Sequence, residues 1–248
     1  MIAWKRLTGV LLFAAALPCG AQQGGDLQAQ ILYAYQTEDF NRLADVMQGL
    51  AAQVKAGDAS AATRYHLAHA EYRYAALAGA RRAQQAEAAL SDCTDQLRAL
   101  LAQDPQSVEA LALDAACYSS LAAHRTMQAV ILHNKAADRL ETAHRLAPRN
   151  ARVLLLMAEA DLARGKPGSP QRARGLAELQ EAADIFDRSP ATDLDAPGWG
   201  HAEAYLVLGR ELLQKGDTLG ARNWIEKALL AAPDYKAAQR AHAELAHR

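Results

Sequence analysis

Four prolines recur at a nearly constant interval along the chain. Pro105, Pro148, Pro190 and Pro233 are separated by 43, 42 and 43 residues, and each follows an amphipathic stretch. Because proline cannot continue a helix, each one marks a helix end followed by a new start. Self-similarity at such an interval is typical of helical-repeat proteins. The period therefore favours an array of small helical units.

Composition agrees with an all-α chain. Alanine supplies 58 of the 248 residues, and aromatic residues only 6%. Alanine is the strongest helix former, and between the prolines apolar residues recur at helical spacing. No segment sustains the period-two alternation of a half-buried strand. We predict one domain of antiparallel helix hairpins, with units at 26–55, 60–105, 107–148, 150–190 and 201–233 and a capping helix at 234–248.

The last unit resembles a tetratricopeptide repeat (TPR). Small residues stand where its two helices should cross, with large residues around them. Eight positions match that family's signature at its spacing: Tyr205, Leu208, Gly209, Leu212, Ala221, Ile225, Ala228 and Pro233. The other units match less well. The resemblance implies a right-handed solenoid whose concave surface binds proteins.

The resemblance also implies which residues line that concave groove. In the TPR family the inner surface is lined mainly by the first helix of each pair, at positions between the packing residues. At these positions leucines alternate with charged residues. Such a mixture would form an apolar strip for a ligand, with polar groups beside it that orient the ligand. Alternatively, the leucines bury against a neighbouring hairpin or the capping helix. The groove positions carried over are Arg152, Leu155, Glu159, Leu162, Glu203, Leu206, Arg210 and Leu213.

Cys93 and Cys117 lie at equal distances on either side of Pro105, twelve residues before it and twelve after. On two antiparallel helices joined at that proline, both would lie about 18 Å from the turn, at the same height. Both also fall on apolar faces. The sequence leaves two possibilities open, which are a disulfide between successive hairpins and two buried free thiols.

The N-terminus has the pattern of a secretory signal peptide. Lys5 and Arg6 precede an apolar run at 7–17, which is too short to span a membrane, and Pro18 breaks it. Cleavage after Ala21 would remove residues 1–21 and leave a mature chain without a stable membrane segment. A retained anchor and lipidation at Cys19 are the alternatives. We expect an exported protein, with the bacterial periplasm as its compartment.

The sequence offers no catalytic, cofactor or metal site. His66 and His69 have ligand-like spacing, but a third ligand is missing, and surface histidines are the simpler interpretation. Asp193 and Asp195 resemble part of a calcium loop without its later ligands. Phosphate-binding and hydrolase motifs are absent. With a formal net charge of -1, nothing favours nucleic acid as a partner.

These observations predict a periplasmic or secreted TPR-like scaffold or adaptor that binds a protein or peptide, and no enzyme. Three alternatives remain open. One is an accessory component that delivers a solute or lipid to an envelope transporter. Another is a component of outer-membrane or pilus assembly, and the third is an enzyme with an unrecognised site. An enclosed apolar cavity would favour solute binding, whereas an open groove would favour an adaptor.

Overall fold

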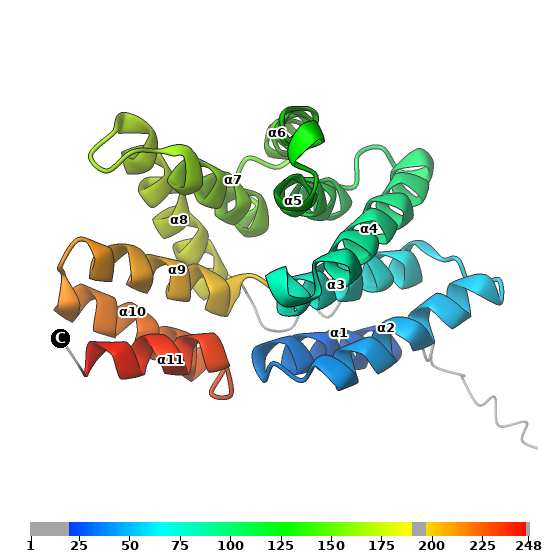
Figure 1. Ribbon diagram of the computed structural model, residues 1–248, viewed down its shortest axis with the longest axis horizontal. Coiled ribbons are helices and arrows are strands. Elements are labelled where there is room, and N and C mark those ends of the chain that lie inside the picture. Colours follow the sequence, from blue (N-terminus) through cyan, green and yellow to red (C-terminus); the bar gives the residue numbers. More distant parts are fainter. Residues whose placement is uncertain (1–19, 190–196, 247–248) are drawn as a thin grey trace, which may run out of the picture.

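The computed structural model describes residues 20–189 and 197–246, and the side chains from residue 27 onward. The described chain is all helical, as the composition predicts, and most of its helices form antiparallel pairs (Figure 1). The helices are α1 (Gly20–Gln36), α2 (Phe40–Lys55), α3 (Ala61–Ala78), α4 (Ala83–Gln103), α5 (Val108–His124), α6 (Ala129–Leu146), α7 (Ala151–Arg164), α8 (Pro170–Arg188), α9 (His201–Gln214), α10 (Thr218–Ala231) and α11 (Lys236–Leu245).

The helix boundaries follow from local sequence chemistry. Three of the periodic prolines, Pro105, Pro148 and Pro233, each lie two residues beyond a helix end, while Pro190 is outside the described residues. Short polar side chains begin the helices by accepting otherwise unpaired backbone N–H groups. The Ser60 hydroxyl accepts from the N–H of Thr63, and the Asp217 carboxylate accepts from that of Gly220.

The packing role expected of the small TPR-signature residues is visible between α9 and α10. A Cβ atom added to Gly209 would lie 2.5 Å from Cγ1 of Ile225 and 3.1 Å from the carbonyl oxygen of Ala221. Both neighbours are fully buried. The two helices therefore approach each other so closely that the crossing point has no room for a side chain.

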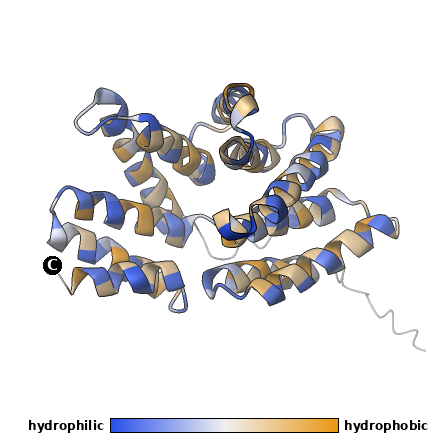
Figure 2. Ribbon diagram, viewed as in Figure 1, coloured by the Kyte–Doolittle hydropathy of each residue, from blue (hydrophilic) through white to orange (hydrophobic). Residues whose placement is uncertain are grey.

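Hydrophobic and hydrophilic residues alternate along the helices, as is typical of amphipathic helices (Figure 2). The buried residues form three clusters, which lie mainly over α1–α3, α3–α7 and α7–α11. Helix α3 contacts α1, α2, α4 and α5. Because neighbours surround it, even several of its polar residues are buried.

The arc of helix pairs curves back on itself, so that α11 lies beside α1 (Figure 1). The rings of Tyr35 and Tyr235 are 6.2 Å apart, and the Arg240 guanidinium donates to the Glu38 carboxylate. Glu38 lies in the turn between α1 and α2. The two ends of the solenoid are thus in direct contact, and the stack forms a closed arc.

Within the described residues, no helix is both long enough and apolar enough to cross a membrane. The segment proposed as a signal peptide lies almost entirely outside the described residues.

Candidate functional site

A buried ion pair joins the second helix pair to the fifth across the middle of the arc. The Arg73 guanidinium of α3 donates to the Glu203 carboxylate of α9 over 2.6 Å, and both residues are buried. Arg73 also donates to Nε2 of His69 over 3.1 Å and stacks on the ring of Tyr35 at 4.3 Å. Burial and the nearby Arg73 charge hold the pKa of His69 well below its usual value, so this imidazole is neutral and can accept the hydrogen bond.

The segment before α9 fills the same central region. Trp199 is buried, its indole N–H donates to the Tyr65 hydroxyl over 2.9 Å, and its ring lies beside that of His69. The carbonyl of Pro197 accepts a hydrogen bond from Arg152, which itself pairs with Glu109 at 2.6 Å. The chain therefore occupies with its own residues much of the inner space that an open solenoid would present to a partner.

This arrangement corrects the prediction of a concave groove. Leu155, Leu162, Leu206 and Leu213 are all buried, and they belong to the cluster over α7–α11. The leucines bury inside the fold against neighbouring hairpins and the capping helix, which is the alternative interpretation that the sequence left open. The charged residues of the predicted groove differ in their surroundings. Arg152 and Glu203 form the ion pairs described above, whereas Arg210 is exposed.

Glu159, one of the predicted groove residues, lines a cavity. That cavity lies between α5, α6 and α7 and has a volume of about 260 Å³. Small side chains on three facing helices leave the space, since alanine reaches less far than the leucines around it. Its apolar lining includes Ala115, Ala116, Ala136, Ala137, Leu156 and Ala160, and its polar lining includes Tyr72, Ser119, Ser120, His133 and Arg164.

The cavity continues into a crevice of about 410 Å³ between α6 and the α7–α8 pair. Ala137, Leu140, Ala160 and Arg164 line both spaces. At the crevice the Arg174 guanidinium donates to the Asp161 carboxylate over 2.7 Å. Because the two spaces share lining residues, we name them together the α6–α7 crevice.

Glu159 is the lining residue with the most unusual electrostatics. Burial, and the like charge of Glu203, raise the pKa of its carboxyl to about 7, although the nearby Arg73 charge lowers it. Within the part of the chain that the structure describes, no residue donates a hydrogen bond to this carboxylate. The cavity therefore contains a carboxyl group whose pKa is raised to about 7.

Exposed apolar side chains lead into the α6–α7 crevice. Met127 is 100% exposed, and Val130 is 73% exposed. Positions three and four apart share one face of a helix, so Val130, His133 and Ala137 form a single stripe along α6. The last two of these line the cavity. This stripe, in which Val130 and Ala137 are apolar and His133 is polar, runs from the start of α6 to the cavity.

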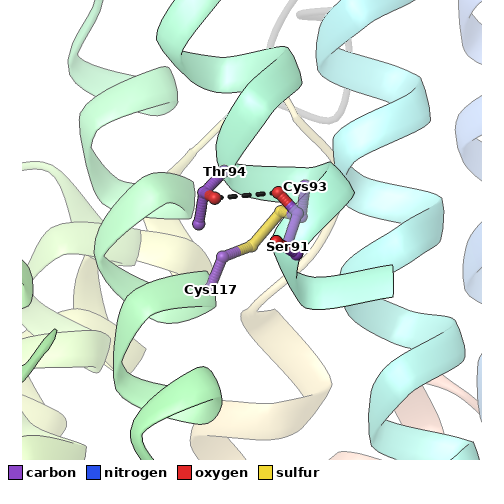
Figure 3. Close-up of a disulfide and its surroundings, with 4 residues drawn as sticks. All are labelled: Ser91, Cys93, Thr94 and Cys117. Carbon is purple, nitrogen blue, oxygen red and sulfur yellow. Dashed lines mark hydrogen bonds between the residues drawn. A yellow bond between two sulfur atoms is a disulfide. The ribbon is translucent and has the colours of Figure 1, made fainter. Parts of the chain in front are cut away.

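A disulfide holds one wall of this site. Cys93 of α4 and Cys117 of α5 are bonded, with their Cα atoms 6.5 Å apart (Figure 3). Both are fully buried, as their apolar faces indicated. Of the two possibilities that the sequence left open, the structure has the disulfide. It joins the second helix pair to the third, and so fixes α5, which supplies Ala115 and Ala116 to the cavity.

The histidine pair does not lie on the surface, where the sequence predicted it. His66 and His69 are buried, 7% and 1% exposed, rather than on the surface. The reason is the position of α3 between neighbouring helices and the Trp199 segment. Among the described residues, no group of three or more His, Cys, Asp or Glu side chains is arranged to hold a metal ion. Asp193 and Asp195 lie outside the described residues.

Comparison with known proteins supports the fold. No protein-family model matches the chain, and no curated protein matches it. Among solved structures, a thermophilic TPR protein of Thermus thermophilus is similar over 92% of this chain and 100% of its own, with 18% identity and a TM-score of 0.64. The Cut9–Hcn1 hetero-tetramer of the APC/C matches over 89% of this chain and 42% of its own, with 12% identity and a TM-score of 0.40.

The chain therefore has the TPR fold, a solenoid of antiparallel helix hairpins, and the resemblance seen in its last unit extends over most of its length.

Proposed function

We propose that this protein is an exported TPR-like scaffold or adaptor that binds a protein or peptide partner along the α6–α7 crevice. The observation that carries the proposal is the pair of exposed apolar side chains, Met127 and Val130, beside the α6–α7 crevice, which Ala137 lines. Exposed apolar side chains beside a concave surface are typical of interaction sites. The leucines of the predicted groove are buried within the fold, so the crevice is the better candidate.

Site-specific photocrosslinking tests the proposal. A photoreactive phenylalanine analogue replaces Val130 in cells of the native host, and the same analogue replaces Leu230 in a control. Leu230 is also apolar and 82% exposed, but it lies on α10. We expect a discrete crosslinked protein at position 130 and none at 230. The captured protein is then purified and titrated against the unlabelled chain.

The substitution Val130→Asp should weaken that purified complex at least about tenfold, because a charge would be buried against an apolar partner surface. Leu230→Asp is the matched control and should leave the affinity unchanged. Equal crosslinking at both positions, or equal affinities of the two variants, would contradict the assignment of the crevice.

Export is the second part of the proposal. Its support is the sequence pattern of Lys5 and Arg6, the apolar run at 7–17 and Ala21. N-terminal sequencing of the protein from its native host should begin at or near Gln22, in the periplasmic fraction. Recovery of a chain that begins at Met1 from the soluble cytoplasm would contradict export.

A further inference from the structure

Glu159 lines the cavity and belongs to a group of three charged residues whose charges do not balance. Glu159 lies within electrostatic reach of both Arg73 and Glu203. Arg73 already donates to the Glu203 carboxylate over 2.6 Å, at a buried position. One guanidinium thus serves two carboxylates. When Glu159 is ionised, these three residues carry two negative charges and one positive charge. Arg164, which also lines the cavity, is paired with Asp161 at 3.8 Å.

The rest of the cavity suits the apolar stem of a cation. Alanines from α5, α6 and α7 form its walls, together with Leu140 and Leu156. A dry apolar cavity of roughly 150 Å³ accommodates benzene, so a space of this size has room for a short alkyl chain. Ser119, Ser120 and Tyr72 add hydroxyl groups to the lining, and hydroxyl oxygens can accept hydrogen bonds from an ammonium group.

We propose that the cavity between α5, α6 and α7 binds a primary ammonium group on a short alkyl stem, with Glu159 as its counter-ion. The ammonium N–H groups would donate to the Glu159 carboxylate in a charge-assisted hydrogen bond at a site of low dielectric. The alkyl stem would replace water against the alanine walls. Two sources supply this chemistry, a free small amine and a lysine side chain of a protein.

Binding should depend on pH, because only the ionised carboxyl group is a counter-ion. The pKa of Glu159 is raised to about 7, so the ionised fraction rises about tenfold between pH 6 and pH 8. The charged or titratable groups that face Glu159 are Tyr72 and Arg73 from α3, His133 from α6, Arg164 from α7 and Glu203 from α9.

Calorimetric titration of the full mature chain with n-butylammonium at constant ionic strength tests this inference independently of any partner protein. We expect saturable binding at pH 8, roughly tenfold weaker at pH 6, and no comparable binding of 1-butanol. Glu159→Gln keeps the shape of the side chain and removes its charge, so it should weaken binding at least about tenfold. Glu181→Gln, at an exposed position on α8, is the matched control and should bind as the wild type does.

A second variant tests the place of binding rather than the charge. Ala116→Leu adds volume to the cavity wall and keeps the carboxylate, so it should also abolish binding. Circular dichroism melting curves establish that each variant is folded. Absence of saturable binding to the wild type up to roughly 10 mM, or equal affinity in Glu159→Gln, would overturn the inference.

A parallel titration with acetyl-Gly-Lys-Gly-amide distinguishes the two sources of the amine. Tighter binding of the peptide than of n-butylammonium would identify a lysine of a protein partner, whereas tighter binding of n-butylammonium would identify a free amine. Either result supports an ammonium site. If neither compound binds while the Val130 crosslink is still obtained, this inference fails and the proposed scaffold function stands.

Discussion

At the scale of single residues, Gly209 is a position of the TPR signature at which the packing of α9 on α10 leaves no room for a side chain. Gly209→Ala should lower the free energy of unfolding by about 1–3 kcal/mol, because the added Cβ meets Ile225 and the α10 backbone. The matched control is Gly49→Ala in α2, where a Cβ would meet no atom within 4 Å. There alanine should raise stability by up to ~1 kcal/mol through helix propensity. Urea denaturation measures both, and equal effects would contradict the close approach of α9 and α10.

Glu71 is a residue whose burial should make stability depend on pH. Desolvation, and the like charges of Asp92 and Asp95, raise its pKa to about 9, and its buried Oε2 has no hydrogen-bond partner among the described residues. The folded chain then keeps a proton that the unfolded chain loses above about pH 4.5. The free energy of unfolding should therefore fall as pH rises from about 4.5 towards 9.

Glu71→Gln should remove this contribution, so the variant should gain stability over the wild type as pH rises through that window. Urea denaturation at pH 5, 7 and 8.5 measures the difference. Asp45→Asn at an exposed position of α2 is the control and should leave the pH dependence unchanged. A constant difference between Glu71→Gln and wild type at all three pH values would contradict the raised pKa.

At the scale of helices, the Arg73–Glu203 pair couples α3 to α9, although the two residues are 130 positions apart in the chain. Arg73→Met should lower the free energy of unfolding by about 3–5 kcal/mol, because it leaves Glu203 buried without a cation. Adding Glu203→Gln should recover at least about 1 kcal/mol, since the uncompensated charge is then removed. A double variant no more stable than Arg73→Met alone would show that the two side chains are not coupled. Chemical denaturation of the four proteins of this cycle supplies the measurement.

At the scale of the whole molecule, contact between the two ends distinguishes a closed arc from an open solenoid. Tyr235 is buried against Tyr35, so Tyr235→Ala should loosen the end of α1 although it alters the chain 200 residues away. Amide hydrogen exchange at residues 33–38 should accelerate about tenfold, equivalent to ~1.4 kcal/mol of local stability. Leu230→Ala, which changes an exposed residue of α10, should leave that segment unchanged. Unaltered exchange at 33–38 in Tyr235→Ala would argue for an open arc in solution.

The sequence by itself determined the local architecture of this protein. Helix ends follow from the prolines and from capping residues such as Ser60 and Asp217, because these act on neighbouring backbone groups. The small residue at Gly209 and the equal spacing of Cys93 and Cys117 about Pro105 also depend only on consecutive helices. For all of these features, the sequence distance is short and the geometry is that of one or two helices.

Only the tertiary structure decided what covers each inner face. Periodicity predicts that Leu206 and Leu213 lie on an apolar face, but it does not say whether a partner or the chain itself buries that face. In the structure both leucines are buried in the cluster over α7–α11, so the chain itself covers that face. The angles between successive helix pairs also bring α11 to α1 and Trp199 to Tyr65 and His69. Such contacts join residues up to about 200 positions apart, and no local pattern encodes the angle at which successive helix pairs meet.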